Sequence, residues 1–175
     1  EIKKFKKNNF SFQIKNIESI DISKKYINSL NQNKFVRYNI KEKINKKYQV
    51  HYIHEHNISS DKIVIGLFNK NKLIGTCGAQ RKSKKKFYIG IFIFNKKFQG
   101  FKLSKILISY LSYYLYRKER ISFVFASVNK KNFKSHNLFK SLEFKINHKE
   151  KKRYKSDIVY FVNIKKLRQM QYFLL

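Results

Sequence analysis

Residues 87–117 read FYIGIFIFNKKFQGFKLSKILISYLSYYLYR. The first eight residues, Phe87 to Phe94, form an almost unbroken apolar run, which predicts a strand buried on both faces at the centre of a sheet. From Leu103 onward apolar residues recur three and four positions apart, which predicts an amphipathic helix over 102–117. The polar residues between these two elements predict a loop, so the stretch is expected to form a strand, a loop and a helix in direct succession.

Further strands and helices are predicted on both sides of this unit. Alternation and helical spacing predict, in chain order, a strand at 10–20, helices at 23–30 and 43–56, a hairpin at 63–79, a strand at 121–128, a helix at 132–142 and two strands after 144. Ser23 is the expected N-cap of the first helix, and the apolar side of the second is expected to carry Ile44, Tyr48 and Tyr52. This order indicates an α/β (α+β) fold, a mixed central sheet flanked by helices. With 175 residues, no internal repeat and no Ser/Gly/Pro linker, we expect one domain over residues 1–175.

The charge of the chain is strongly positive. It carries 41 Lys and Arg against 10 Asp and Glu, a formal net charge of +31. Only six of the 41 are Arg, and the abundance of Lys, Asn, Ile, Phe and Tyr is the bias that AT-rich codons impose on any protein. A nucleic-acid binder uses Arg more often, because its fork holds phosphate through two hydrogen bonds. The composition therefore argues against a nucleic-acid partner, although the charge attracts any polyanionic ligand.

The composition also bounds the kind of site and the location. A single cysteine, Cys77, excludes an internal disulfide and a multi-cysteine metal site, so no metal site is predicted. The longest apolar runs are far shorter than the roughly 20 residues that a membrane span needs. No signal-peptide pattern opens the sequence, and we expect a cytoplasmic protein. The sequence is compatible with a monomer and with a homodimer.

The loop between the central strand and the long helix has the features of an anion site. A helix N-terminus presents unpaired backbone N–H groups and the positive end of the helix dipole. Gly100 and Ser104 are small, which lets a diphosphate approach the backbone closely. Lys102 and Lys105 add positive charge. The pattern therefore predicts a site for a diphosphate or a similar anion.

Two motifs in this half of the chain resemble those of the GCN5-related N-acetyltransferase (GNAT) superfamily. Gln99-Gly100-Phe101-Lys102-Leu103-Ser104 resembles the acyl-CoA loop of that family, Gln/Arg-x-x-Gly-x-Gly/Ala. The stretch from Val128 to Phe144, VNKKNFKSHNLFKSLEF, is similar to the family pattern Val-Asn-x-x-Asn-x-x-Ser/Ala-x-x-Leu-Tyr/Phe-x-x-Leu-Gly-Phe. The resemblance covers residues 63–144 well and the two ends of the chain loosely.

The resemblance implies a single GNAT-like domain in which two parallel strands splay apart and hold acetyl-CoA, a co-substrate used without a metal. It implies that a primary amine attacks the thioester directly, which makes the protein an N-acetyltransferase, a type of acyltransferase. The pantetheine arm is expected on the strand and the diphosphate on the loop. The cofactor-binding residues implied are Ile91, Phe92, Ile93, Gln99, Gly100, Phe101, Lys102, Leu103, Ser104, Lys105 and Asn132.

The resemblance leaves the general acid and base unassigned. In many members a Tyr in the last helix protonates the departing sulfur, but the matching residue here is Phe139. In some members a Glu late in the preceding strand is the base, and the matching residue is Ser127. Asn132 matches the family and is, with Ser127, the catalytic candidate. Otherwise a water chain or a group of the N-terminal half must serve, with candidates at His51, His54, Glu55 and His56.

Two departures from the motifs concern the backbone. Lys102 replaces the middle glycine of the loop, and Glu143 replaces the glycine of Leu-Gly-Phe. We expect a negative φ at Lys102, because this residue enters a helix. We expect strain at Glu143, because the family turn takes a positive φ there.

The acceptor is expected to contact the N-terminal half. The segments Tyr26–Asn31 and Phe35–Tyr38 resemble a subgroup of polysaccharide-locus amino-sugar acetyltransferases and ribosomal-protein alanine acetyltransferases. A sugar nucleotide is anionic and suits the basic surface, which favours an amino-sugar nucleotide as the acceptor. Two alternatives stay open, a protein N-terminus of the ribosomal type and a degenerate module that binds CoA or nucleic acid without turnover.

Overall fold

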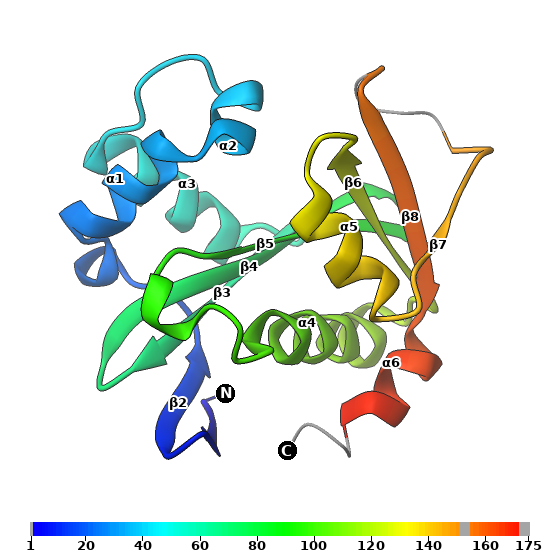
Figure 1. Ribbon diagram of the computed structural model, residues 1–175, viewed down its shortest axis with the longest axis horizontal. Helices are drawn as coiled ribbons and strands as arrows, with labels where there is room; N and C mark the ends of the chain where they lie inside the picture. The colour runs from blue at the N-terminus through cyan, green and yellow to red at the C-terminus, as the bar shows by residue number, and fades with distance from the viewer. Residues whose placement is uncertain (1, 151–154, 172–175) are drawn as a thin grey trace. The chain divides into compact units, whose positions relative to one another are not determined.

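The computed structural model describes residues 2–150 and 155–171 and contains a mixed sheet with flanking helices (Figure 1). Hydrogen-bonded strands follow the order β1-β2-β3-β4-β5-β6-β8-β7. The strands are β1 (Lys3–Lys7), β2 (Phe10–Lys15), β3 (Lys62–Asn69), β4 (Lys72–Ser83), β5 (Lys86–Ile93), β6 (Phe123–Asn129), β7 (Lys145–Ile146) and β8 (Asp157–Asn163). The helices are α1 (Lys24–Gln32), α2 (Lys34–Asn39), α3 (Lys46–Ile58), α4 (Leu103–Glu119), α5 (Phe133–Lys140) and α6 (Ile164–Gln171), with short 3₁₀ turns η1 (Ser19–Asp21) and η2 (Lys96–Phe98). The predicted α/β class with a mixed sheet is confirmed.

The described chain divides into two compact units, each with its own strands and helices. Unit 1 contains the residues up to 78 together with 91–103, and unit 2 contains 79–90 and the described residues from 104 onward. Strands β4 and β5 contribute to both units, because the boundary cuts each of them once. None of the helices in the part of the chain that the structure describes is long and apolar enough to cross a membrane.

Local sequence signals start the helices of unit 1. The Ser23 side chain accepts a hydrogen bond from the Tyr26 N–H at 3.2 Å, which caps α1 at the predicted residue. Asn33 lies between α1 and α2 and caps α2, because its side chain accepts hydrogen bonds from the N–H groups of Phe35 and Val36. Lys70 and Asn71 both have a positive φ, so the β3–β4 hairpin closes through a two-residue turn whose twist matches that of its strands.

The core of unit 1 corrects one prediction. The expected apolar face of the 43–56 helix included Tyr48 and Tyr52. Both tyrosines lie in α3, and both side chains are exposed. Gln49, Ile53 and His56 are buried instead. Gln49 can be buried because its Nε2 donates to the Tyr26 hydroxyl at 3.1 Å, which satisfies both polar groups.

Unit 2 is built around β6. This strand pairs with β5 in parallel and with β8 antiparallel over seven residue pairs, from Phe123 opposite Asn163 to Asn129 opposite Asp157. Asn132 caps α5, where its Oδ1 accepts from the Ser135 N–H at 3.2 Å. Helix α4 buries Leu107, Ile108, Leu111 and Leu115 completely, as the spacing of its apolar residues predicts.

The end of α5 confirms the predicted strain at Glu143. The Phe144 N–H donates to the Phe139 carbonyl at 3.0 Å, and the two rings lie 4.9 Å apart. This bond pattern and ring contact define a helix terminus that needs a left-handed residue just before Phe144. Glu143 occupies that position with φ +60°, where glycine is free of the Cβ penalty.

We predict that Glu143→Gly raises the free energy of unfolding by about 1 kcal/mol, because it removes a left-handed Cβ clash of roughly that size. For a chain of this length the melting temperature is expected to rise by roughly 2–4 °C. Glu143→Ala is the control, because it removes the same exposed carboxylate and keeps the Cβ. Equal melting temperatures for the two variants in thermal unfolding would contradict the account.

Candidate active site

The parallel ladder between β5 and β6 is short, and this shapes the candidate site. Phe87 lies opposite Val124 and Tyr88 opposite Phe125, and these are the two pairs of the register. Both strands continue beyond that point, β5 to Ile93 and β6 to Asn129. The two parallel strands that the resemblance implies are therefore present. Their hydrogen-bonded pairing stops after two residue pairs.

The second half of β5 is less buried than predicted. The expectation of a strand buried on both faces is wrong for Gly90, which is exposed, and for Ile91, Phe92 and Ile93, which are half-buried. Gly75 of β4 keeps this end of β5 close, because a Cβ there would come within 2.4 Å of the Ile93 side chain and 3.1 Å of the Phe92 carbonyl. Three apolar side chains are thus left partly open at the strand end that leads into the loop.

The loop after β5 is anchored by its aromatic residues and by Gln99. Phe98 is buried and makes edge contacts with Phe10, Phe12 and Phe101 at centroid distances of 5.4, 5.5 and 5.8 Å. The Gln99 Nε2 donates to the Ile93 carbonyl at 3.2 Å, which ties the loop back to the end of β5. These contacts hold the loop while Gly100 and Lys102 stay exposed.

The backbone of the loop differs from the expectation at Lys102. We predicted a negative φ there, but Lys102 has φ +59° and Gly100 has φ +91°. The prediction was wrong because α4 begins only at Leu103, so Lys102 is still in the turn before the helix. A Cβ built on Gly100 meets no atom within 4 Å, so the space beside this backbone is open. The N–H groups that follow, up to Lys105, belong to the first turn of α4, where helices leave donors unpaired.

Ser127 and Asp157 form a hydrogen-bonded pair on one face of β6 and β8. The Ser127 hydroxyl donates to Asp157 Oδ2 at 2.6 Å. Asp157 is buried, with 5% of its surface exposed, whereas Ser127 is half-buried. Sequence analysis named Ser127 and missed Asp157. The available signal was a carboxylate at an inward position of the alternating strand 157–163.

The other predicted catalytic positions have structural partners. Asn132 caps α5 with its side-chain oxygen, which accepts a hydrogen bond from the Ser135 N–H. Phe139, at the position of the usual Tyr, is buried between Phe144 and Tyr160 and has no hydroxyl to donate. The Tyr160 hydroxyl contacts Nδ1 of the buried His136 at 2.8 Å. Neither Phe139 nor Asn132 thus offers a free acid or base.

The histidines near the end of α3 do not form a site. His51 is exposed and lies 3.4 Å from Glu55. His56 is buried, its Nδ1–H donates to the Tyr52 carbonyl at 2.7 Å, and burial lowers its pKa below the ordinary 6.5. Among the described residues no three His, Cys, Asp or Glu side chains gather as metal ligands do. Burial also raises the pKa of the Cys77 thiol, so this residue is a protonated thiol and a poor nucleophile.

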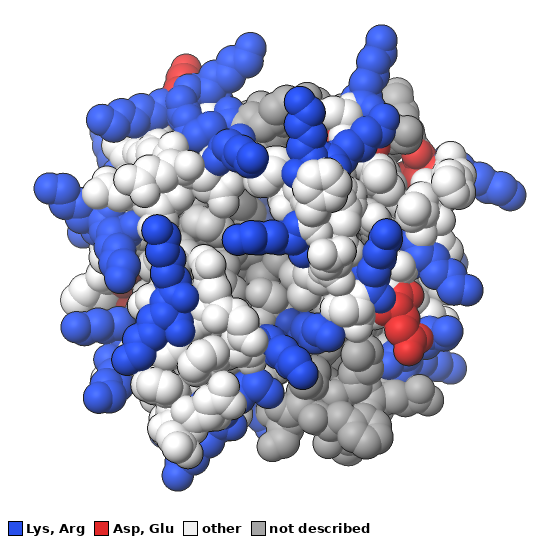
Figure 2. Space-filling view, in the orientation of Figure 1, with Lys and Arg blue, Asp and Glu red and all other residues white. Residues whose placement is uncertain are grey.

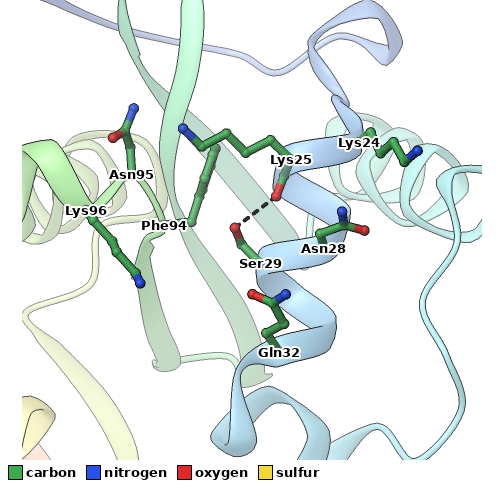
Figure 3. Close-up of a pocket in the computed structure, with 8 residues that line it drawn as sticks. All are labelled: Lys24, Lys25, Asn28, Ser29, Gln32, Phe94, Asn95 and Lys96. Carbon is green, nitrogen blue, oxygen red and sulfur yellow. Dashed lines mark hydrogen bonds between the residues drawn. The ribbon is translucent and has the colours of Figure 1, made fainter.

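A basic pocket of about 490 Å³ lies within unit 1, between α1 and the residues that follow β5 (Figure 3). Its lining consists of Lys24, Lys25, Asn28, Ser29, Gln32, Phe94, Asn95 and Lys96. Figure 3 shows Lys25, Ser29 and Gln32 on the side of α1 that faces Phe94, with the Lys24 and Asn28 side chains on the other side. None of the lining residues is acidic. Sequence analysis did not identify this pocket, because α1 and the loop are far apart in the chain.

The sequence matches the family model of the acetyltransferase (GNAT) family over residues 26–144. The chain belongs to this family. It is a GNAT N-acetyltransferase. No curated protein matches the sequence.

Solved structures share the fold of this GNAT enzyme at low identity. Campylobacter jejuni N-acetyltransferase PseH is 16% identical, with a TM-score of 0.59 over 87% of this chain and 97% of that chain. The PaiA N-acetyltransferase of Thermoplasma acidophilum, solved with coenzyme A, is 16% identical, with a TM-score of 0.70 over 87% and 98%. Salmonella typhimurium YncA, a putative acetyltransferase solved with acetyl-CoA, is 12% identical, with a TM-score of 0.70 over 87% and 94%.

We predict that Gly100→Val weakens CoA binding by this GNAT enzyme tenfold or more, measured by calorimetry. The side chain would fill the open space beside the loop and would strain a backbone with φ +91°. Lys102→Ala is expected to weaken binding only about two- to fivefold, as one exposed charge near a helix end is worth about 0.3–1 kcal/mol. A larger effect of Lys102→Ala, with both melting temperatures unchanged, would show a side-chain clamp in place of a backbone cradle.

Proposed function

We propose that this N-acetyltransferase acetylates the primary amine of a small anionic acceptor, an amino-sugar nucleotide. The observation that carries the acceptor class is the basic pocket of unit 1, with three lysines and three side-chain amides in its lining. Lysine ammonium groups and amide N–H groups donate to phosphate oxygens, and charged bonds of this kind are the strong ones. Phe94 lines the wall of the pocket but is itself buried, with 7% of its surface exposed.

On the donor side, we propose that the diphosphate of acetyl-CoA binds the backbone from Gly100 to Lys105 and the pantetheine arm binds Ile91–Ile93. The supporting observations are the open space at Gly100, the unpaired donors that a helix start provides, and the half-buried strand end. Asn132 and Ser127 are the proposed catalytic contacts. The charge of the surface supports anionic substrates in general, since Figure 2 shows Lys and Arg over much of the viewed face and few acidic side chains.

Lys25 and Lys96 are the two residues proposed to hold the phosphate of the acceptor. Figure 3 shows the Lys25 side chain extending toward Phe94 from α1, and the Lys96 side chain descending on the opposite side of the pocket. Both reach the same open volume from different elements. We propose that an anion bound in this volume is attracted by both ammonium groups.

We predict that thiol release from acetyl-CoA is faster with UDP-glucosamine than with glucosamine 1-phosphate, and slowest with glucosamine. All three offer the same primary amine, and each anchored phosphate is expected to raise kcat/KM about tenfold or more, since a charged hydrogen bond contributes about 1.5–3 kcal/mol. The differences should shrink as salt screens the lysines. Equal rates for the three sugars would contradict the proposal, and a strong preference for an alanine-initiated peptide would identify a protein N-terminal acetyltransferase instead.

Paired variants link this preference to the pocket. Lys25→Gln and Lys96→Gln are expected to reduce the advantage of UDP-glucosamine over glucosamine, with little effect on glucosamine itself. Lys47→Gln is the matched control, because it removes the same charge from an exposed position of α3, in the same unit but outside the lining of the pocket. Equal effects of Lys47→Gln and Lys25→Gln would mean that net charge, and not the pocket, attracts the acceptor.

A further inference from the structure

We propose that Asp157, acting through Ser127, takes up the proton that the acceptor amine loses before it attacks the thioester. The proposal assigns the base that the sequence motifs leave open. It rests on the N-acetyltransferase reaction of the family and holds for any primary amine, whichever acceptor the pocket of unit 1 selects.

The geometry of the pair is that of a charged hydrogen bond. Ser127 lies opposite Val159 and Asn129 lies opposite Asp157, so Ser127 and Asp157 are diagonal neighbours on the same face of β6 and β8. The distance of 2.6 Å between Ser127 Oγ and Asp157 Oδ2 falls in the range of a hydroxyl that donates to a carboxylate. The serine hydrogen thus points at Asp157, and the serine lone pairs are left to face another donor.

The two members of the pair differ in burial, and this difference sets the direction in which a proton moves. Asp157 has 5% of its surface exposed, and Ser127 is half-buried. A carboxylate is expensive to bury unless other groups compensate it, and the ion pairs formed by the described residues do not include Asp157. Ser127 is the partner of Asp157 that is also partly accessible. A proton therefore reaches the carboxylate most directly through the serine hydroxyl.

The position of Ser127 along β6 agrees with this role. The pairing of β6 with β5 ends at Phe125, two residues earlier and on the same face as Ser127. Phe125 stacks on Tyr88 at 5.6 Å, so that face is covered as far as the last pair. Ser127 is the next residue on this face, at the point where β6 continues beyond the parallel ladder.

The second polar pair of unit 2 does not compete for the role. His136 Nε2 lies 3.1 and 3.2 Å from the carbonyl oxygens of Asn129 and Lys130, so it carries a hydrogen, and its Nδ1 contacts the Tyr160 hydroxyl. Tyr160 follows Val159 in β8 and therefore lies on the opposite face from Ser127, packed against Phe139 of α5. The rings of His136 and Tyr160 are both buried, and the hydrogen-bond partners named here all belong to the protein.

The bound ammonium gives one proton to Ser127 Oγ while the serine proton moves to Asp157 Oδ2, which leaves a neutral carboxylic acid. The amine lone pair then forms the C–N bond with the thioester carbonyl, and the C–S bond breaks. The second proton of the nitrogen goes to the departing thiolate, which gives CoA thiol and the amide. Asp157 returns its proton to solvent through Ser127, so each turnover releases one proton.

The test compares single variants and one rescue variant by their rates of thiol release from acetyl-CoA. The acceptor is the amine of the panel that the wild type acetylates fastest, and hydrolysis by water is measured without an amine. Asp157→Asn keeps the size and the hydrogen bond and removes the base, and we expect kcat to fall about 100-fold or more, the usual contribution of a general base. Ser127→Ala should lower kcat by a similar factor, while KM for both substrates stays within about threefold of the wild-type value. Ser156→Ala, a neighbouring hydroxyl, is the control expected to retain activity.

The rescue separates a base from a packing residue. Ser127→Glu combined with Asp157→Asn places a carboxylate at the exposed end of the pair and a donor behind it, and should recover tenfold or more over Asp157→Asn alone. Thermal unfolding and CoA binding of each variant verify folding. Wild-type turnover that survives in Asp157→Asn within twofold would overturn this inference alone. A preference for a peptide amine would overturn only the acceptor class, and no thiol release from the wild type with any amine or with water would overturn both.

Discussion

The early end of the parallel ladder between β5 and β6 is the constraint on which the rest of the structure depends. Every backbone N–H and C=O in a strand needs a partner, and a strand that leaves its neighbour must find another. After Tyr88 and Phe125 the register stops, yet β5 runs to Ile93 and β6 to Asn129. The exposed Gly90 and the half-buried residues after it are what remains when a strand loses its neighbour on one edge. An extended ligand with its own amide groups, such as the pantetheine arm, can supply the missing partners.

The two units carry functional groups of opposite charge. In unit 1 the chain that follows β5 enters a left-handed turn at Gly100 and Lys102, and its neighbour α1 presents lysines to a pocket. In unit 2 the strand that carries Ser127 buries a carboxylate, Asp157. We propose that the cations of unit 1 bind phosphates and that the anion of unit 2 accepts a proton. Both roles serve the proposed reaction, in which anionic substrates bind and an ammonium loses a proton.

The sequence alone predicted the strand, loop and helix at 87–117 because long patterns of apolar residues set them. It also predicted the Ser23 cap and the strain at Glu143, where one residue type fits one local geometry. It failed where the answer depends on tertiary neighbours. Tyr48 and Tyr52 follow helical spacing but are exposed, because the rest of unit 1 buries the adjacent face of α3. Asp157 was missed because only the register of β6 and β8 brings it to Ser127. Lys102 was mispredicted because α4 starts one residue later than expected.

Backbone hydrogen exchange of Gly90–Ile93, followed by NMR with and without CoA, tests the central claim most directly. If the pantetheine arm completes the unpaired edge of β5, saturating CoA should slow exchange of amides in this segment. Amides of β1 and β2, which pair with each other over five residues, should exchange at the same rate with and without CoA. Saturated CoA binding that leaves Gly90–Ile93 unchanged would contradict the account, because the ligand would then bind elsewhere than on the strand that loses its neighbour.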